Sequence, residues 1–131
     1  MNLESPKVRT QKSAEALYQF LVDIKGFEKL MPENHTKFEM IGDDAFIFGL
    51  KGMPEIKLIL KEKVPFTKIV LGTDNDKFPF SLTAQITAIT PTSSDVQLFF
   101  EGEFNTMMSM MIKGPINKFI ETLVQNMTTL S

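Results

Sequence analysis

Residues 106–127 read TMMSMMIKGPINKFIETLVQNM, and the architecture of the whole chain can be worked out from this segment. Its apolar side chains recur at steps of three and four residues, which places them on one face of an α-helix. The residues of this face are Met108, Ile112, Ile116, Phe119, Leu123, Met127 and, just beyond the segment, Leu130. A helix of about 25 residues rises roughly 37 Å. Because this length exceeds the diameter of a compact chain of this size, the helix needs a broad apolar surface to lie on.

The middle of the chain supplies that surface. Between His35 and Asn105 the apolar residues follow a period of two, which is the period of β-strands with one buried face. Six strands are predicted from the apolar sets Phe38/Met40, Phe46/Phe48/Leu50, Ile56/Leu58/Leu60, Ile69/Leu71, Phe80/Leu82/Ala84/Ile86/Ala88 and Val96/Leu98/Phe100/Gly102/Phe104. The intervening residues are mostly polar, and turn residues separate the sets. This pattern is typical of an antiparallel sheet with one face on the core and one in water.

A strand and a helix are predicted before this sheet. Residues 3–11 alternate weakly between apolar and polar side chains, and Pro6, which has no N–H to donate, indicates an edge strand. Ser13 is a suitable N-cap for a helix over residues 14–24. Gly26 is expected to end that helix, because glycine readily adopts the backbone conformation found just after a helix.

A second short helix completes the predicted order of elements. Residues 27–31 have room for one helical turn before Pro32 ends it. The order is therefore β-α-α-β6-α, an α+β fold in which a curved antiparallel sheet wraps around a long C-terminal helix, and residues 1–131 form a single domain. Gly102 is expected to mark a bulge or a close approach of the helix. Pro115 is expected to kink the helix.

The composition excludes several classes of protein. Hydrophobic residues make up 43% and charged residues 23% of the 131 residues, values typical of a globular domain. The chain has no cysteine, which excludes disulfides, zinc–thiolate sites and cysteine nucleophiles. The net charge of −2, with interspersed signs, lacks the positive field expected of a nucleic-acid-binding protein. No signal peptide is recognised and no apolar run approaches the roughly 18 residues of a membrane span, so we expect a cytoplasmic protein without integral membrane association.

Few residues suggest catalysis or metal binding. His35, the single histidine, lies in a polar turn without an identifiable partner. Asp43 and Asp44 are interpreted as turn formers between two strands. The run from Asp74 to Asp76 is interpreted in the same way, because it lacks the glycine and the glutamate of a calcium-binding loop. No catalytic residue, metal site or cofactor is therefore predicted.

Two charged sets on the sheet are interpreted as solvated surface. Glu101 and Glu103 are about 7 Å apart on one strand, but they point away from the side that carries Phe100. A basic stripe across neighbouring strands lacks the interleaved aromatic residues of a nucleic-acid-binding surface. The residues of this stripe are Lys57, Lys61, Lys63 and Lys68.

The methionines at the start of the final helix leave two interpretations open. They are Met107, Met108, Met110 and Met111. The unbranched thioether side chain adapts to irregular surroundings, which suits a core, a ligand pocket or a surface that binds partners. A helix that buries one face needs about two of the four, so Met107 or Met110 is expected to be exposed.

Three stretches of the chain carry a resemblance to a known family. They are residues 13–23 (SAEALYQFLVD), 27–32 (FEKLMP) and 100–119 (FEGEFNTMMSMMIKGPINKF). With the order β-α-α-β6-α, they resemble the START-like, Bet v 1-like superfamily, which includes polyketide cyclases and lipid-transfer domains, and within it a small stand-alone bacterial member. The resemblance implies a helix-grip fold, an internal hydrophobic cavity, and a gate between the loops and the C-terminal helix. The ligands it implies are lipids, polyketides or other apolar metabolites.

The predicted function is binding of a small apolar ligand in a cavity between the sheet and the C-terminal helix, driven by burial of apolar surface. The residues predicted to form the wall are Phe38, Met40, Phe48, Leu58, Leu60, Leu71, Leu82, Ile86, Leu98, Phe100, Met108, Met111, Ile112, Ile116 and Phe119. The protein is expected to be a monomer or a weak homodimer.

Three alternatives stay open at the level of sequence. A cyclase- or dehydratase-type enzyme would have to recruit Tyr18 or Asp23, since most other polar residues fall on turns or on the outer face of the sheet. A protein-interaction module would dock a partner or a second copy through the exposed methionines or the outer face of the sheet. The twelve phenylalanines can also fill the cavity completely, which would leave a domain without a ligand.

Overall fold

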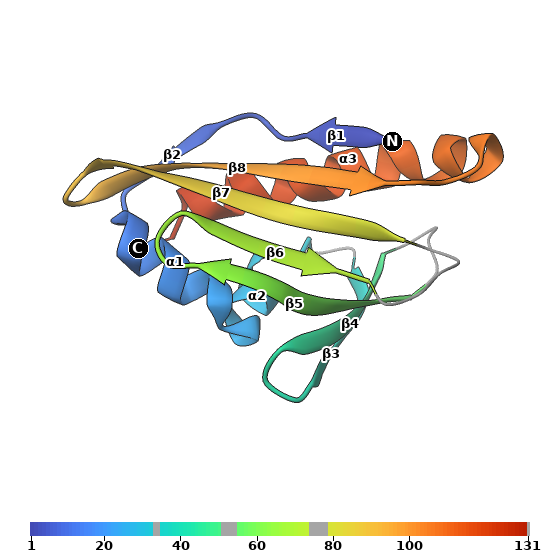
Figure 1. Ribbon diagram of the computed structural model, residues 1–131, viewed down its shortest axis with the longest axis horizontal. Helices are drawn as coiled ribbons and strands as arrows, with labels where there is room; N and C mark the ends of the chain where they lie inside the picture. The colour runs from blue at the N-terminus through green and yellow to red at the C-terminus, as the bar shows by residue number, and fades with distance from the viewer. Residues whose placement is uncertain (33–34, 51–54, 74–78, 131) are drawn as a thin grey trace.

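The computed structural model describes residues 1–32, 35–50, 55–73 and 79–130 of the chain. Within these ranges the helices are α1 (Ala14–Val22), α2 (Ile24–Leu30) and α3 (Thr106–Thr128). The strands are β1 (Asn2–Glu4), β2 (Val8–Thr10), β3 (His35–Ile41), β4 (Ala45–Leu50), β5 (Ile56–Val64), β6 (Lys68–Gly72), β7 (Phe80–Thr90) and β8 (Ser93–Gly102). The predicted α+β architecture is confirmed, with the long helix packed against one curved sheet (Figure 1).

The sheet is antiparallel, and its strands follow the order β1-β8-β7-β6-β5-β4-β3, with β2 also paired to β8. The single strand predicted over residues 3–11 is in fact two short strands, although its place at an edge is correct. Ser5 separates them: its backbone N–H donates to the carbonyl oxygen of Leu98 at 2.9 Å, and its hydroxyl accepts from the Leu98 N–H at 2.9 Å. Pro6 follows directly and cannot donate to the ladder.

The boundary between α1 and α2 differs from the prediction. The Ser13 hydroxyl accepts from the Ala16 N–H at 3.0 Å, so the predicted N-cap is confirmed. Gly26 does not end α1, however, because it lies inside α2, whose N-cap is Asp23. A Cβ atom on Gly26 would lie 2.2 Å from the carbonyl oxygen of Phe20. Glycine is needed at this position for close contact between the two helices.

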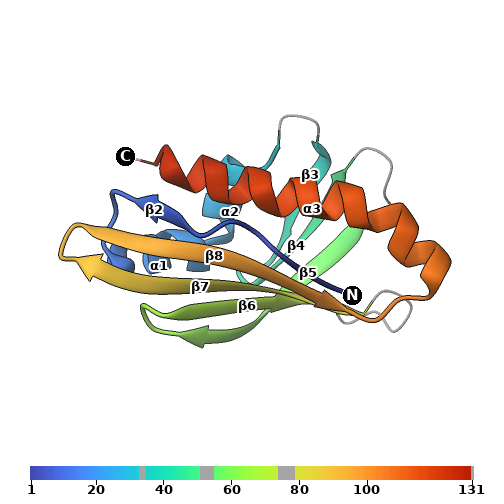
Figure 2. The ribbon, with the colours of Figure 1, turned by 90° about the horizontal axis from the view of Figure 1, so that it is seen from above.

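The helix α3 lies across the concave face of the sheet and buries one side along most of its length (Figure 2). The Asn105 side chain accepts from the Met108 N–H at 2.8 Å and caps its N-terminus. The helix continues through Pro115 without interruption, and Figure 2 shows its axis changing direction in the first half, as the proline predicts. The buried residues of α3 are Ile112, Ile116, Phe119, Ile120, Leu123, Val124 and Met127.

Gly102 is a site of close approach, but the neighbour is a side chain of the adjoining segment and not the helix. A Cβ atom at this position would lie 2.5 Å from Cε2 of Phe104 and 2.9 Å from Cβ of Phe80. The ring of Phe104 also stacks on Phe100, with centroids 6.2 Å apart. The segment after β8 therefore turns back onto the end of its own strand, and α3 begins beyond that contact.

Candidate functional site

Aromatic rings occupy much of the interior between the sheet and α3. Phe48 and Phe119 stack with centroids 5.1 Å apart and planes 9° from parallel, which joins β4 to the helix. Phe46 lies 6.0 Å from Phe48, and Phe38 stacks on Phe46 at 4.9 Å. Phe38, Phe46, Phe48 and Phe119 thus form an aromatic cluster. Because the rings contact one another directly, this part of the interior is filled by the protein's own side chains.

Most residues of the predicted ligand wall belong to the hydrophobic core. Thirteen of the fifteen either form the main buried cluster or pack against it as partly buried side chains. The other two, Met40 and Met111, are not brought to this group, since their exposed fractions are 36% and 59%. Met40 lies near the end of the edge strand β3, and Met111 lies on the outer side of α3.

An open groove borders this core. It lies between the C-terminal end of α2, the end of β4 and α3 from Gly114 onwards. Its volume is about 940 Å³, which falls within the range of small-molecule sites. The lining residues are Lys29, Met31, Pro32, Leu50, Gly114, Pro115, Lys118, Phe119, Thr122, Asn126, Thr129 and Leu130. Phe119 belongs both to this lining and to the aromatic cluster, so it separates the groove from the packed interior.

Polar contacts hold the walls of the groove in place. The Asn126 amide donates to the carbonyl oxygen of Leu30 at 2.8 Å, which fastens α3 to the end of α2. Its partner is one of the carbonyl groups that a helix end leaves without an internal bond. The Thr122 hydroxyl donates to the carbonyl oxygen of Lys118 at 2.8 Å. The groove therefore lies between two helices that the Asn126 bond joins directly.

The charge in the groove is positive. Lys29 and Lys118 are its charged lining residues. Among the described residues, neither lysine forms an ion pair with an acidic side chain. An anionic group placed between the apolar floor and these ammonium groups would meet positive charge that is not already neutralised.

Phe119 is the single residue of the predicted wall that lines this groove. The remaining lining residues come from three separate segments, and several are polar residues of α3. One signal for them is present in the sequence: Lys118, Thr122 and Asn126 are spaced by four residues, as one helical stripe requires. This polar stripe lies beside the apolar one from which the wall was predicted, and it was not part of that prediction.

The residues considered for catalysis do not converge on the groove. Tyr18 is buried and lies edge-on to Phe66, with centroids 5.6 Å apart. Asp23 is exposed and accepts from the Lys25 N–H as the cap of α2. Glu101 and Glu103 are exposed, as predicted from strand parity. Within the described ranges, no group of three His, Cys, Asp or Glu side chains is placed to hold a metal ion.

The structure describes some of the polar residues that were assigned to turns. His35 begins β3, and its ring Nδ1 lies 2.6 Å from the carbonyl oxygen of Pro32, so it has a local partner. Asp43 and Asp44 are exposed in the turn between β3 and β4, as predicted. The run from Asp74 to Asp76 lies outside the described residues.

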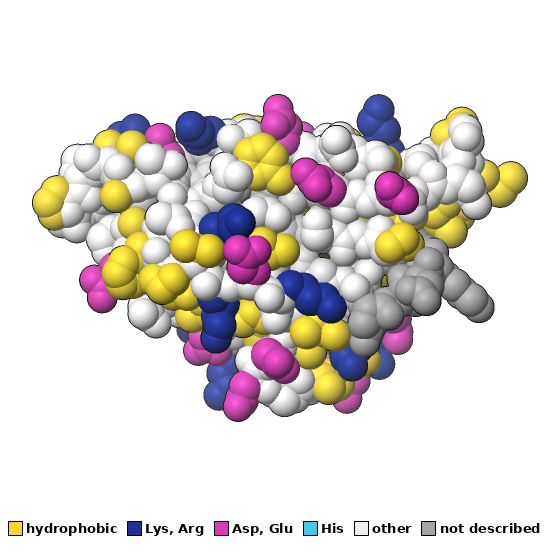
Figure 3. All heavy atoms as spheres, viewed as in Figure 1, with side chains coloured by type: hydrophobic (Ala, Val, Ile, Leu, Met, Phe, Trp, Pro, Cys, Tyr) yellow, Lys and Arg dark blue, Asp and Glu magenta, His cyan; other side chains and the backbone are white. Residues whose placement is uncertain are grey.

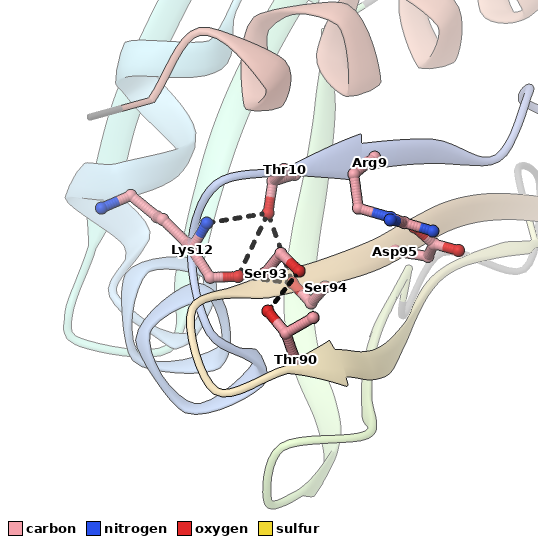
Figure 4. Close-up of polar contacts among 7 residues, drawn as sticks. All are labelled: Arg9, Thr10, Lys12, Thr90, Ser93, Ser94 and Asp95. Atoms are coloured by element: carbon pink, nitrogen blue, oxygen red, sulfur yellow. Dashed lines mark hydrogen bonds and ion pairs between the residues drawn. The ribbon is translucent and has the colours of Figure 1, made fainter.

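A second group of polar residues, at the turn between β7 and β8, serves the fold (Figure 4). The buried Thr10 and Ser94 hydroxyls lie 3.3 Å apart, and the Ser94 hydroxyl donates to the carbonyl oxygen of Lys12 at 2.9 Å. The Arg9 guanidinium pairs with Asp95, and its hydrogen bond holds the pKa of that carboxyl group below its usual value. These contacts attach β2 and the start of α1 to β8.

Comparison with known proteins places this geometry in a fold class. No protein-family model and no curated protein matches the sequence. Among solved structures, a START superfamily protein from Mycobacterium smegmatis superposes with a TM-score of 0.70 at 12% identity, covering 97% of this chain and 94% of that one. The chain has the START-like, Bet v 1-like helix-grip fold. At this identity the similarity concerns the fold and not the activity.

Two further proteins with the helix-grip fold illustrate its range. Norcoclaurine synthase from Thalictrum flavum, solved in complex with dopamine and hydroxybenzaldehyde, superposes with a TM-score of 0.69 at 13% identity, covering 95% of this chain and 84% of that one. The Aha1 dimer from Colwellia psychrerythraea superposes with a TM-score of 0.70 at 12% identity, covering 98% and 93%. Among the described residues, no helix has the length and apolar character needed to cross a membrane.

Proposed function

We propose that this protein binds a small, largely apolar molecule, such as a lipid, a polyketide or a similar metabolite, in the groove between α2, β4 and α3. The observation that carries the proposal is an open volume of about 940 Å³ whose floor includes Met31, Leu50 and Phe119. Removing apolar surface from water contributes about 25 cal/mol per Å². A groove with such a floor therefore favours a ligand with an apolar body.

The location modifies the sequence-based prediction without discarding it. The predicted wall lies mostly behind Phe119, in the packed core. A ligand in the groove contacts Phe119 first, and it reaches Phe48 only if the Phe119 ring leaves its stack on Phe48. In this proposal the aromatic cluster is the base of the site, and its rings limit how deeply a ligand enters.

The two lysines of the groove add a preference for charge. Lys29 and Lys118 favour a ligand whose apolar body ends in a carboxylate, sulfonate or phosphate group. A partly exposed charge interaction of this kind contributes modestly, on the order of 1 kcal/mol, because water and salt screen it. Apolar burial is thus expected to dominate affinity, and the lysines are expected to set the orientation.

Two fluorescent probes with similar aromatic bodies test both parts of the proposal. Anilinonaphthalene sulfonate carries a negative charge, and N-phenyl-1-naphthylamine does not. We expect the folded protein to bind both probes and to bind the sulfonate more tightly. Lys118→Gln should weaken binding of the sulfonate alone. If the folded protein binds neither probe, the proposal is wrong.

A groove-filling variant localises the binding. Thr122→Phe adds a large side chain to the lining, whereas Gln125→Phe adds the same side chain on an exposed position of α3 that does not line the groove. We expect Thr122→Phe to weaken both probes at least about tenfold, a loss of 1.4 kcal/mol, and Gln125→Phe to leave binding unchanged. Circular dichroism confirms that both variants are folded. Equal binding by the two variants would place the probes elsewhere and contradict the groove.

A further inference from the structure

The strand β3 is an open edge of the sheet. It comes last in the strand order, and in the part of the chain that the structure describes it pairs with β4 alone. Figure 1 shows its outer side facing away from the rest of the sheet. A strand of seven residues is about 23 Å long. Its outward N–H and C=O groups can pair with another strand.

The opposite edge is a poorer template. There β1 and β2 have three residues each, and Ser5 and Pro6 interrupt them. A strand of three residues offers few backbone groups, and Pro6 removes one donor. The asymmetry singles out β3 as the edge through which this sheet can be extended.

The sequence of β3 is complementary to itself in one register. It reads HTKFEMI, and in a symmetric antiparallel pair each residue faces the residue equally far on the other side of the central one. With Phe38 at the centre, Lys37 of each copy faces Glu39 of the other. Centring on Lys37 or Glu39 instead sets two like charges against each other, which destabilises a strand pair. Centring on Thr36 or Met40 places neither charge opposite the other.

We propose that β3 pairs antiparallel with β3 of a second copy of this chain, about a twofold axis at Phe38, so that the two sheets join into one. The partner is a second copy because the register that matches opposite charges is symmetric. This inference does not depend on the ligand proposed for the groove.

In a single copy, the charged residues of β3 already lie close together on one face of the sheet. The Lys37 ammonium lies 3.5 Å from carboxylate oxygens of both Glu39 and Glu55, on the outer side of the sheet. In the symmetric register the two copies bring two lysines and two Glu39 carboxylates into one cluster of alternating charge. Exposed pairs of this kind add little stability individually, but they select register and partner.

The apolar side of the strand gains cover from the pairing. Phe38 is half-buried and stacks on Phe46 at 4.9 Å, and Met40 beside it keeps 36% of its surface in water. In the proposed register Phe38 faces Phe38 of the second copy, and Met40 lies diagonally across from that ring. Diagonal neighbours in a sheet are within reach of aromatic and long side chains. The pairing thus covers apolar surface that a single copy leaves exposed.

The same strand limits the strength of the dimer. The register of β3 with β4 shifts between His35 and Lys37, and such irregularities shorten the usable part of an edge. An interface of a few residue pairs from one strand falls in the size range of transient complexes. A dimer that dissociates on dilution is therefore expected.

Charge exchange tests this register directly. In a dimer of either single variant, Lys37→Glu or Glu39→Lys, positions 37 and 39 carry the same charge. Both of the pairs that these positions form across the interface are then repulsive. We expect each variant alone to dimerise about tenfold or more weakly than the unchanged protein. The double variant Lys37→Glu/Glu39→Lys restores both attractive pairs and should dimerise like the unchanged protein. An equimolar mixture of the two single variants should also recover dimer, since each supplies the charge that the other needs.

The measurement is sedimentation velocity over a hundredfold range of protein concentration. Lys57→Glu, on the exposed outer face of β5, is the matched control and should not change the dissociation constant. Recovery in the mixture shows that the single variants are folded. The proposal is overturned if the unchanged protein stays monomeric throughout, or if the single variants dimerise as well as it does.

Discussion

The two halves of α3 share one helix but have different surroundings. From Pro115 onwards the helix is anchored in the core, and Leu123 has none of its surface exposed. In the first half, Met107 and Met110 expose 74% and 78% of their surface. Figures 1 and 2 show the first turns extending past the end of β8, and Figure 3 shows hydrophobic side chains at that end of the molecule. Burial along α3 is thus set by where the sheet ends as well as by the helical pattern.

The largest expected difference between the halves is in core packing. Leu123→Ala should lower the free energy of unfolding by about 2–5 kcal/mol, because it leaves a cavity among fully buried side chains. Met110→Ala, the matched change in the first half, should alter it by less than about 0.5 kcal/mol, because the side chain is already in water. Urea denaturation measures both. Equal losses in the two variants would show that the first half is packed in solution.

A smaller effect is expected at the start of the helix. The first half has little packing, so the cap formed by Asn105 with the Met108 N–H is a larger part of what holds it. Asn105→Ala should cost about 1 kcal/mol, and Asn105→Asp should retain most of that stability. Hydrogen exchange at the amides of the first two turns is the measurement. The second half should exchange as before, and a uniform increase along α3 would mean that the halves unfold together.

The smallest effect is expected on the exposed methionines. Met107→Lys combined with Met110→Lys should change the unfolding free energy by less than about 0.5 kcal/mol. It should also leave the dissociation constant of the dimer unchanged, because the proposed contact is at β3. Sedimentation velocity and urea denaturation test the two statements. A loss of dimer in this variant would identify the methionine surface as an interface and would support the interaction hypothesis drawn from the sequence.

The order of the elements was predictable because each depends on a local pattern. The alternation in β7 and β8 and the stripe from Met108 to Met127 both follow the face that is buried. The pattern does not show how far a neighbouring sheet extends, so the exposure of Met111 was not predicted. Nor does it show which helix a glycine belongs to: Gly26 follows Asp23 closely, and the cap at Asp23 decides the boundary.

The groove was less accessible to prediction than the fold. Its lining combines Met31 and Pro32 after α2, Leu50 at the end of β4, and several positions of α3. These segments are adjacent only after the sheet has curved and α2 has docked on α3. From the sequence alone, Asn126 is indistinguishable from an exposed polar residue, because its hydrogen bond to the end of α2 depends on how the two helices pack. Phe119 was found because it is both a core residue and a groove residue.

The pairing of β1 and β2 with β8 has a consequence for how the chain folds. The backbone N–H of Gly102 donates to the carbonyl oxygen of Met1 at 3.0 Å, a contact between residues 101 positions apart. Contacts of such long range require loop closure before they return any free energy. Domains that depend on them fold slowly, commonly over milliseconds to seconds. During synthesis, β1 and β2 therefore remain unpaired until β8, the strand that they pair with, has left the ribosome.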